Sequence, residues 1–251
     1  MPLMKIVVYT AIYGINAGLV KQPQFPGVDY VCFTDNGSLR SKLWDVRLVK
    51  GQIEGDHTRN NRYYKINPHK FFLEYDISIY VDGNFLIIGD IISLCKSTLK
   101  NFDMACFDHN QTFSDKRDCI YDEYGAILKI THKKAYKDDP DIMLKQIQGF
   151  KKEGYPKNNG LIVGGVLIRR HNKPNVIKVM DAWWQILLTG SKRDQLSFNY
   201  VAWKNNFKYK LINGDARYGN PWFRILGPNM KSYWFRIIKY RLFTLLGIKR
   251  S

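Results

Sequence analysis

The sequence is poor in cysteine and has no long hydrophobic run. Its 251 residues include four cysteines without CxxC spacing, namely Cys32, Cys95, Cys106 and Cys119. This pattern predicts reduced thiols in the core and favours neither a zinc site nor a disulfide framework. No apolar run reaches the ~18–20 residues that a membrane span needs, and the first residues lack the zones of a signal peptide. We therefore expect a protein that is made and kept in the cytosol.

Acidic residues are also scarce. The chain has 39 Lys+Arg against 22 Asp+Glu, a formal net charge of +17. Asp215 is the last acidic residue, and residues 216–251 contain eight basic ones. With 45% hydrophobic and 14% aromatic residues, general disorder is excluded. The charge alone suits nucleic acid, an anionic membrane or another protein equally.

Apolar and helical patterns alternate along the chain without an internal repeat or a low-complexity linker. This predicts a single α/β domain with a central sheet flanked by helices. The expected strands cover residues 5–9, 30–34, 44–48, 77–81, 104–107 and 161–169. The expected helices cover residues 58–66, 68–75 and 174–188, with another beginning at Ser191.

Polar residues directly follow several of these strands, where open α/β sheets bind their ligands. They are residues 10–13, 35–36 and 82–84. The carboxylate of Asp82 and the amide of Asn84 offer oxygen ligands for Mg²⁺ or Mn²⁺, and Gly83 allows a sharp bend between them. The same three residues are also typical of a simple strand-ending turn.

Three cations precede the strand that ends at Asp82. Arg59, Arg62 and Lys65 are spaced by three and share one helix face. Such a cluster binds phosphate if it faces the crevice, whereas a solvated helix face is the alternative.

Two further patterns have competing interpretations. Ser191 and Asp194 have the spacing of a capping box, but a carboxylate at that position also suits the handling of a sugar hydroxyl. Gly164 and Gly165 interrupt a β-branched strand, which indicates either a bulge or the close approach of a ligand.

Taken in order, six segments carry a resemblance that covers about Lys5 to Trp203: YTAIYG, VDYVCFTDN, RNNRYYKINPHKFF, SIYVDGNFLI, GGVLIRRHN and SKRDQLSF. Together they resemble the TOD/MUCI-type glycosyltransferase-like domain family, formerly a domain of unknown function. Such domains are similar to GT-A-fold nucleotide-sugar transferases, whose D-x-D signature holds a divalent metal on the donor diphosphate. The resemblance implies a GT-A-like (Rossmann-related) domain with a mixed, mostly parallel sheet. It also implies Mn²⁺ or Mg²⁺ at Asp82 and Asn84, the latter departing from the usual second aspartate.

The resemblance implies roles for further residues. Thr10, Ala11 and Tyr13 would border the nucleotide base, and Asp35 would contact the base or ribose. The other residues expected to bind the donor are Arg59, Arg62, Lys65, Gly83, Gly164, Gly165 and Gln195. Asp194 would be catalytic, and Asp215 would replace the histidine that often serves as a further metal ligand. Asp194 would act as the base if the enzyme inverts configuration, and the leaving phosphate would do so if it retains configuration.

The chain is expected to divide into a domain over residues 1–230 and a basic, aromatic tail over 231–251. As an amphipathic helix, the tail suits an anionic membrane surface; closing the core of the domain is the alternative. The leading hypothesis is a glycosyltransferase in cell-surface polysaccharide biosynthesis, peripheral at the cytoplasmic face of a membrane. It would use a nucleotide-sugar donor, by default a UDP-sugar, and a glycan or lipid-linked acceptor. A nucleic-acid-binding protein, for which no recognised motif is present, and a sugar-nucleotide nucleotidyltransferase are the alternatives.

Overall fold

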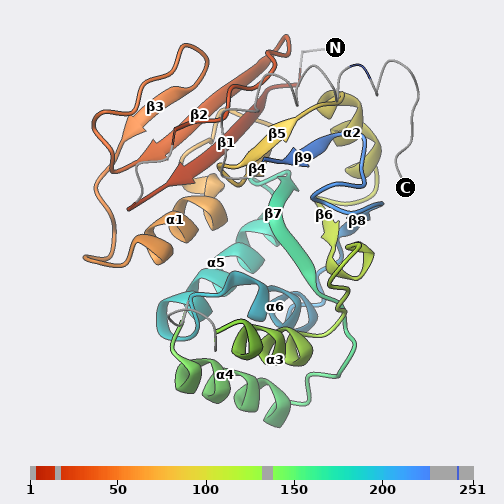
Figure 1. The fold of residues 1–251 in the computed structure, drawn as a ribbon. Helices are drawn as coiled ribbons and strands as arrows, with labels where there is room; N and C mark the ends of the chain where they lie inside the picture. The colour runs from red at the N-terminus through yellow and green to blue at the C-terminus, as the bar shows by residue number, and fades with distance from the viewer. Residues whose placement is uncertain (1–3, 15–17, 132–137, 227–241, 243–251) are drawn as a thin grey trace.

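A computed structural model describes residues 4–14, 18–131, 138–226 and 242. In this part of the chain, strands and helices alternate (Figure 1). The strands are β1 (Ile6–Ile12), β2 (Val28–Thr34), β3 (Asp45–Leu48), β4 (Ile77–Val81), β5 (Phe85–Ile87), β6 (Met104–Asp108), β7 (Ile162–Arg169), β8 (Lys210–Ile212) and β9 (Phe223–Ile225). The helices are α1 (His57–Ile66), α2 (Ile91–Thr98), α3 (Ile120–Thr131), α4 (Pro140–Lys152), α5 (Pro174–Thr189) and α6 (Phe198–Lys204), with short 3-10 turns η1 (Pro68–Lys70), η2 (His109–Gln111) and η3 (Asp194–Leu196).

Seven strands form one mixed, mostly parallel sheet in the order β3-β2-β1-β4-β7-β6-β8. Strands β1 to β4 are parallel, β7 is antiparallel to both of its neighbours, and β8 is parallel to β6. This confirms the expected α/β class. Because only β7 is reversed, its amino end lies at the same edge as the carboxyl ends of the other six strands. We call this edge the carboxyl edge of the sheet.

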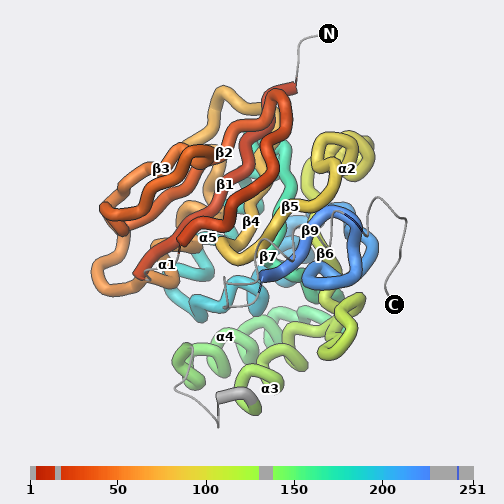
Figure 2. Tube along the Cα trace, turned by 45° about the horizontal axis from the view of Figure 1, so that its top comes forward, coloured from red at the N-terminus to blue at the C-terminus, as the bar shows by residue number. Residues whose placement is uncertain are grey.

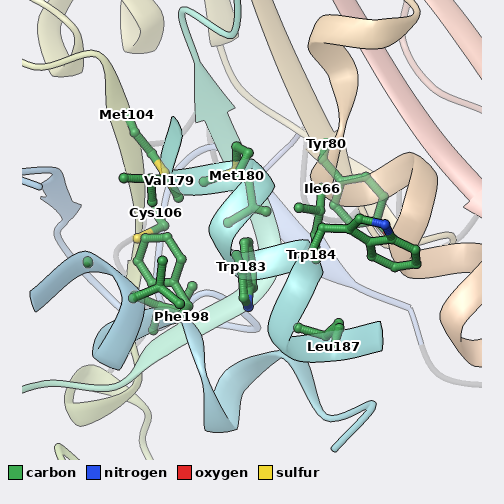
Figure 3. Close-up of a cluster of buried hydrophobic side chains, with 14 of the residues drawn as sticks. Ile66, Tyr80, Met104, Cys106, Val179, Met180, Trp183, Trp184, Leu187 and Phe198 are labelled. Atoms are coloured by element: carbon green, nitrogen blue, oxygen red, sulfur yellow. The ribbon is translucent and has the colours of Figure 1, made fainter. Parts of the chain in front are cut away.

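Successive side chains along a strand point to opposite faces of the sheet, and both faces are buried. On one face, residues such as Val7 and Tyr9 pack with α1 and α3 to α6. On the other face, Ile6 and Val8 join a cluster that includes α2 and the β5–β9 ribbon. Figure 3 shows part of the first cluster, in which Trp183 of α5 packs against Phe198 of α6 with 4.8 Å between ring centroids. Figure 2 shows α3 and α4 together, away from β2 and β3.

Two of the helix predictions are wrong. Residues 68–75 contain only the 3-10 turn η1, because the chain turns back to bury Phe72 completely in the core. No α-helix begins at Ser191, because its hydroxyl donates to Asp138 and accepts from the Arg193 amide. The next α-helix begins only at Phe198, after η3.

The structure describes the four cysteines but almost none of the expected tail. The four cysteines are free and buried, as expected. Residues 231–251, the expected tail, lie outside the described residues apart from Leu242. Within the described ranges, no helix is both long enough and apolar enough to span a membrane.

Candidate functional site

Charged side chains from α1 and η3 meet at the carboxyl edge of the sheet. Lys65 Nζ donates a hydrogen bond to Asp194 Oδ2, and Arg62 Nε lies 3.3 Å from the same oxygen. The pair is buried, with side-chain exposures of 2% for Lys65 and 7% for Asp194. With Asp82, whose charge acts on both cations, these residues form what we call the donor cluster: Arg62, Lys65, Asp82 and Asp194.

The two cations keep Asp194 ionised. Burial by itself raises the pKa of this carboxyl, but Arg62 and Lys65 outweigh burial and hold the pKa well below its ordinary value. The Arg62 guanidinium is stabilised in turn, since Asp194 raises its pKa despite burial. An ionised, doubly paired carboxylate is a weak proton acceptor and a strong anchor for the cations.

Asp82 follows β4 in a tight turn, where the Phe85 amide donates to the Asp82 carbonyl over 2.9 Å. Its side-chain Oδ1 accepts the Tyr80 hydroxyl at 2.9 Å. Burial and the neighbouring Asp82 charge raise the pKa of Tyr80 well above its ordinary value, so Tyr80 stays a donor. Asp82 is half-buried and Asn84 is exposed. Their carboxylate and amide oxygens are the donor types that Mg²⁺ and Mn²⁺ prefer, so the residues present fit the expected metal.

The two glycines of β7 make room for this cluster. A Cβ added at Gly164 would lie 3.0 Å from Lys65 Nζ and 3.1 Å from Asp194 Oδ2. One at Gly165 would lie 2.9 Å from the Phe85 ring and 3.2 Å from Asp82 Oδ2. The strand also bulges here, since Cys106 pairs with Leu167 but Phe107 pairs with Val163. The bulge expected as one alternative is therefore confirmed, and side chains of this chain occupy the space beside the glycines.

The ends of β1 and β2 lie along the same edge. The Thr10 hydroxyl is buried without a hydrogen-bond partner in the described part of the chain, and it lies 3.9 Å from where a Cβ of Gly83 would be. The Ala11 carbonyl accepts a hydrogen bond from Asn61 of α1. Asp35 accepts the Gly14 amide at 3.1 Å and lies 3.3 Å from His57 Nδ1.

Tyr13 lies in the core instead of the open edge. Its ring stacks on Tyr64 with 5.8 Å between centroids, and only 6% of the residue is exposed. A role for Tyr13 at the nucleotide base therefore rests on the resemblance alone.

Three other predicted site residues form hydrogen bonds with backbone groups that hold the fold together. Arg59 binds the carbonyls of Leu187 and Gly190 at the end of α5, away from Arg62 and Lys65. Gln195 donates to the Ile162 carbonyl at 2.8 Å, which ties η3 to the start of β7.

Asp215 is the third of these residues. Its two carboxylate oxygens accept the backbone amides of Phe113 at 3.0 Å and Arg217 at 2.8 Å. It thus joins the loops after β6 and β8. Across the described residues, no group of three or more His, Cys, Asp or Glu side chains is arranged to hold a metal.

Residues that pattern reasoning missed hold the cluster in place. Arg169 of β7 is completely buried and donates to Tyr9 Oη and to the Lys65 carbonyl at the end of α1. Tyr9 Oη donates to the same carbonyl at 2.7 Å. A cation at a helix C-terminus satisfies carbonyls that lack helical partners. The sequence signal that could have identified Arg169 is an arginine at the end of an otherwise apolar, β-branched strand.

A second charged group lies further along the same edge. We call it the loop cluster; it consists of Asp115, Arg117, Glu123, Arg193 and Arg217, and its shortest ion pair joins Arg117 Nε to Glu123 Oε2 at 2.7 Å. Burial and Arg117 lower the pKa of the adjacent His109. A separate polar hollow of about 400 Å³ lies at the opposite edge of the sheet, between residues 101–103, 175–179 and 205–208. It is remote from both clusters.

Three comparisons with known proteins bear on the family of this chain. A search of the solved structures finds the apo form of mouse xyloside xylosyltransferase 1, with 12% sequence identity, a TM-score of 0.46 and coverage of 84% of this chain and 85% of that one. A search of the curated proteins finds no match. Residues 29–214, well over half of the chain, match the family described as TOD1/MUCI70, glycosyltransferase-like domain. The chain therefore belongs to the TOD1/MUCI70 glycosyltransferase-like domain family.

Proposed function

We propose that this protein transfers a sugar from a nucleotide-sugar donor, with a UDP-sugar as the first candidate, to a glycan or lipid-linked acceptor of a cell-surface polysaccharide. Membership of a glycosyltransferase-like family supports glycosyl transfer in general. The observation that carries the proposal is the donor cluster, in which two cations and two carboxylates from three segments of the chain meet at the carboxyl edge. Ligands of α/β sheets bind at that edge.

Arg62 is the group that would contact the donor diphosphate, and Lys65, buried against Asp194, would add positive charge behind it. Arg62 is the more accessible, with 20% of its side chain exposed, and its planar fork suits phosphate oxygens. Because the two cations already face Asp82 and Asp194, the charges of the cluster cancel before a donor arrives. Mg²⁺ or Mn²⁺ held by Asp82 and Asn84 would supply the extra positive charge that stabilises the leaving diphosphate.

Asp194 acts in this proposal as the anchor for the two cations. Its pKa, held low by Arg62 and Lys65, makes it a weak base, so its contribution is to fix both cations where negative charge develops on the leaving group. Tyr80 does the same for Asp82 by donating to one carboxylate oxygen and leaving the other for a ligand.

A thermal-shift screen of nucleotide sugars with and without Mn²⁺ tests this function. Donor at 100 times its Kd should stabilise the fold by about 2.7 kcal/mol. Asp82→Asn should remove the Mn²⁺-dependent part of the shift, because the amide lacks the charge that holds the metal. Asp45→Asn is the matched control, since that aspartate is 61% exposed at the edge strand β3.

Three outcomes count against the proposal: no nucleotide sugar stabilises the protein, Asp82→Asn responds like the wild type, or the purified protein releases pyrophosphate from nucleoside triphosphates. The last would identify a nucleotidyltransferase.

The proposal includes action at the cytoplasmic face of an anionic membrane, supported by the basic and aromatic composition of residues 231–251. A chain ending at Met230 should lose binding to anionic vesicles while keeping donor-dependent stabilisation. If the shortened chain bound anionic vesicles as the whole chain does, membrane binding through residues 231–251 would be ruled out.

A further inference from the structure

Two loops beyond the donor cluster are joined into one surface. They comprise residues 109–119, after β6, and residues 213–222, after β8. Asp215 binds the Phe113 amide, Gln111 Oε1 accepts the Gly214 amide at 2.6 Å, and Arg217 spans both oxygens of Asp115 at 3.1 and 3.3 Å. The bonds at Asp215 thus fix the backbone that carries the next feature.

This surface presents two aromatic rings to solvent. Phe113 is 60% exposed on the first loop, and Tyr218 is 55% exposed on the second. The Phe113 ring lies against Gly219, where an added Cβ would be only 2.4 Å from its Cζ. One part of the ring therefore rests on the neighbouring loop while the rest stays open, which holds it in a defined orientation.

A series of ion pairs runs from Arg193, the residue before Asp194, to Arg217, the residue before Tyr218. Arg193 directly precedes Asp194 and lies 3.9 Å from Glu123, which Arg117 contacts at 2.7 Å. Arg117 also reaches Asp115 at 3.4 Å, and Asp115 holds Arg217 beside Tyr218. The loops therefore extend the same edge of the sheet away from the donor position.

We propose that Phe113 and Tyr218 form the platform on which a sugar ring of the acceptor glycan stacks. The apolar C–H face of a pyranose matches an exposed aromatic face, and the charged side chains around the rings match its hydroxyl groups. Asp115, Arg117 and Arg217 surround the platform, each 18–32% exposed. Two rings within charged surroundings form a patch too small for a stable protein interface. The assignment of the sugar as an acceptor rests on the proposed function; its binding at the rings does not.

Saturation-transfer NMR tests the platform with the methyl glycosides of xylose, glucose, galactose and N-acetylglucosamine as probes. At least one glycoside should receive saturation in the full-length protein, chiefly at its ring C–H protons. Phe113→Ala and Tyr218→Ala should each weaken its binding by about five- to tenfold, the scale of an aromatic contact. Phe113→Tyr should retain binding, because it keeps the ring.

Two further variants separate the platform from general surface effects. Gly219→Ala should weaken glycoside binding as well, because its methyl group displaces the Phe113 ring without removing it. Leu73→Ala is the matched control; that leucine is 75% exposed but precedes β4, at the opposite edge of the sheet. It should leave glycoside binding unchanged, and the Kd of UDP should not change in any of these variants.

The outcomes distinguish this proposal from the proposed function. The platform is overturned if no glycoside receives saturation, if Phe113→Ala and Tyr218→Ala bind glycoside like Leu73→Ala, or if they lower only binding to anionic vesicles. If glycoside binding maps to the rings but no nucleotide sugar stabilises the protein, the transferase proposal fails and the platform stands.

Discussion

The donor cluster and the loop cluster use the same kinds of residue at the same edge of the sheet, yet they differ in burial. Side-chain exposure is 2% for Lys65 and 7% for Asp194 in the donor cluster. In the loop cluster Glu123 is equally buried, at 5%, but the outer pair is open to solvent, with 29% for Arg217 and 32% for Asp115. Buried charge pairs contribute little net stability because desolvation offsets their attraction, and exposed pairs contribute little because water screens them. The difference appears when one partner is removed.

Loss of Asp194 should have the largest effect. Asp194→Ala leaves Lys65 buried and deprives Arg62 of its nearest carboxylate, so the free energy of unfolding should fall by about 3–5 kcal/mol. Chemical denaturation measures the change. Donor-dependent stabilisation should also disappear, because nothing then fixes the two cations.

The double variant Lys65→Met/Asp194→Leu sharpens this result. Removing both buried charges should restore much of the stability lost in Asp194→Ala, while nucleotide-sugar binding stays absent. If the double variant were less stable than Asp194→Ala, the pair would be a source of fold stability and the contrast with the loop cluster would be wrong.

The glycines of β7 should rank second. Gly164→Ala places a methyl group 3.0 Å from Lys65 Nζ and 3.1 Å from Asp194 Oδ2, so the buried pair must move, at a cost of about 1–3 kcal/mol. Gly149→Ala in α4 is the control, because a Cβ there meets nothing within 4 Å. That change should stabilise the helix by about 0.5–1 kcal/mol. Equal effects at the two positions, measured by denaturation, would show that the cluster tolerates displacement.

Local patterns predicted the parts of the fold that depend on nearby residues. The β-branched runs at residues 77–81 and 161–169 correspond to β4 and β7, and the apolar periodicity of residues 174–188 corresponds to α5. These elements were predictable because the spacing of buried side chains along a strand or helix can be read from the local sequence. The helix predicted over residues 68–75 is absent because the turn that buries Phe72 depends on packing partners distant in the sequence.

For the candidate site, the spacing of Arg62 and Lys65 and the strand-ending Asp82 predicted that these residues lie near one another at the carboxyl edge of the sheet, as they do in the structure. The partner of Asp194 was not predictable: η3 follows α1 by more than 120 residues, and only the folded sheet brings them together. The loop contacts of Asp215 were equally hidden: the resemblance alone suggested a metal ligand there, and its partner Phe113 lies 102 residues away in the sequence.

Acid should separate the two clusters. Burial and Arg117 keep the pKa of His109 below its ordinary value of 6.5, so its neutral form stabilises the fold above that pH, and this stability falls as the pH drops below 6.5. Asp194 has a lowered pKa, so its contribution is present above its ordinary value of 3.8 and is lost only below it.

The free energy of unfolding should therefore fall between pH 7 and pH 5, and His109→Gln should remove up to about 1 kcal/mol of that fall. His69 and His171, whose pKa values burial also lowers, account for a further part of it. A fall that His109→Gln leaves unchanged would place the acid sensitivity outside the loop cluster. Donor-dependent stabilisation should survive at pH 5, because Asp194 is still ionised there.

The smallest effect should come from the exposed end of the loop cluster. Arg217→Gln removes a two-pronged contact to Asp115 whose partners are both about a third exposed, so the free energy of unfolding should change by less than about 1 kcal/mol. Because Asp215 still joins the loops through backbone amides that the substitution leaves in place, the Phe113 ring should stay in position and glycoside binding should be retained. Asp215→Asn removes the charge from that joint and should cost more than Arg217→Gln in denaturation and in glycoside binding. If Arg217→Gln had the larger effect, ion pairing would hold the loops together, and the loop cluster would resemble the donor cluster after all.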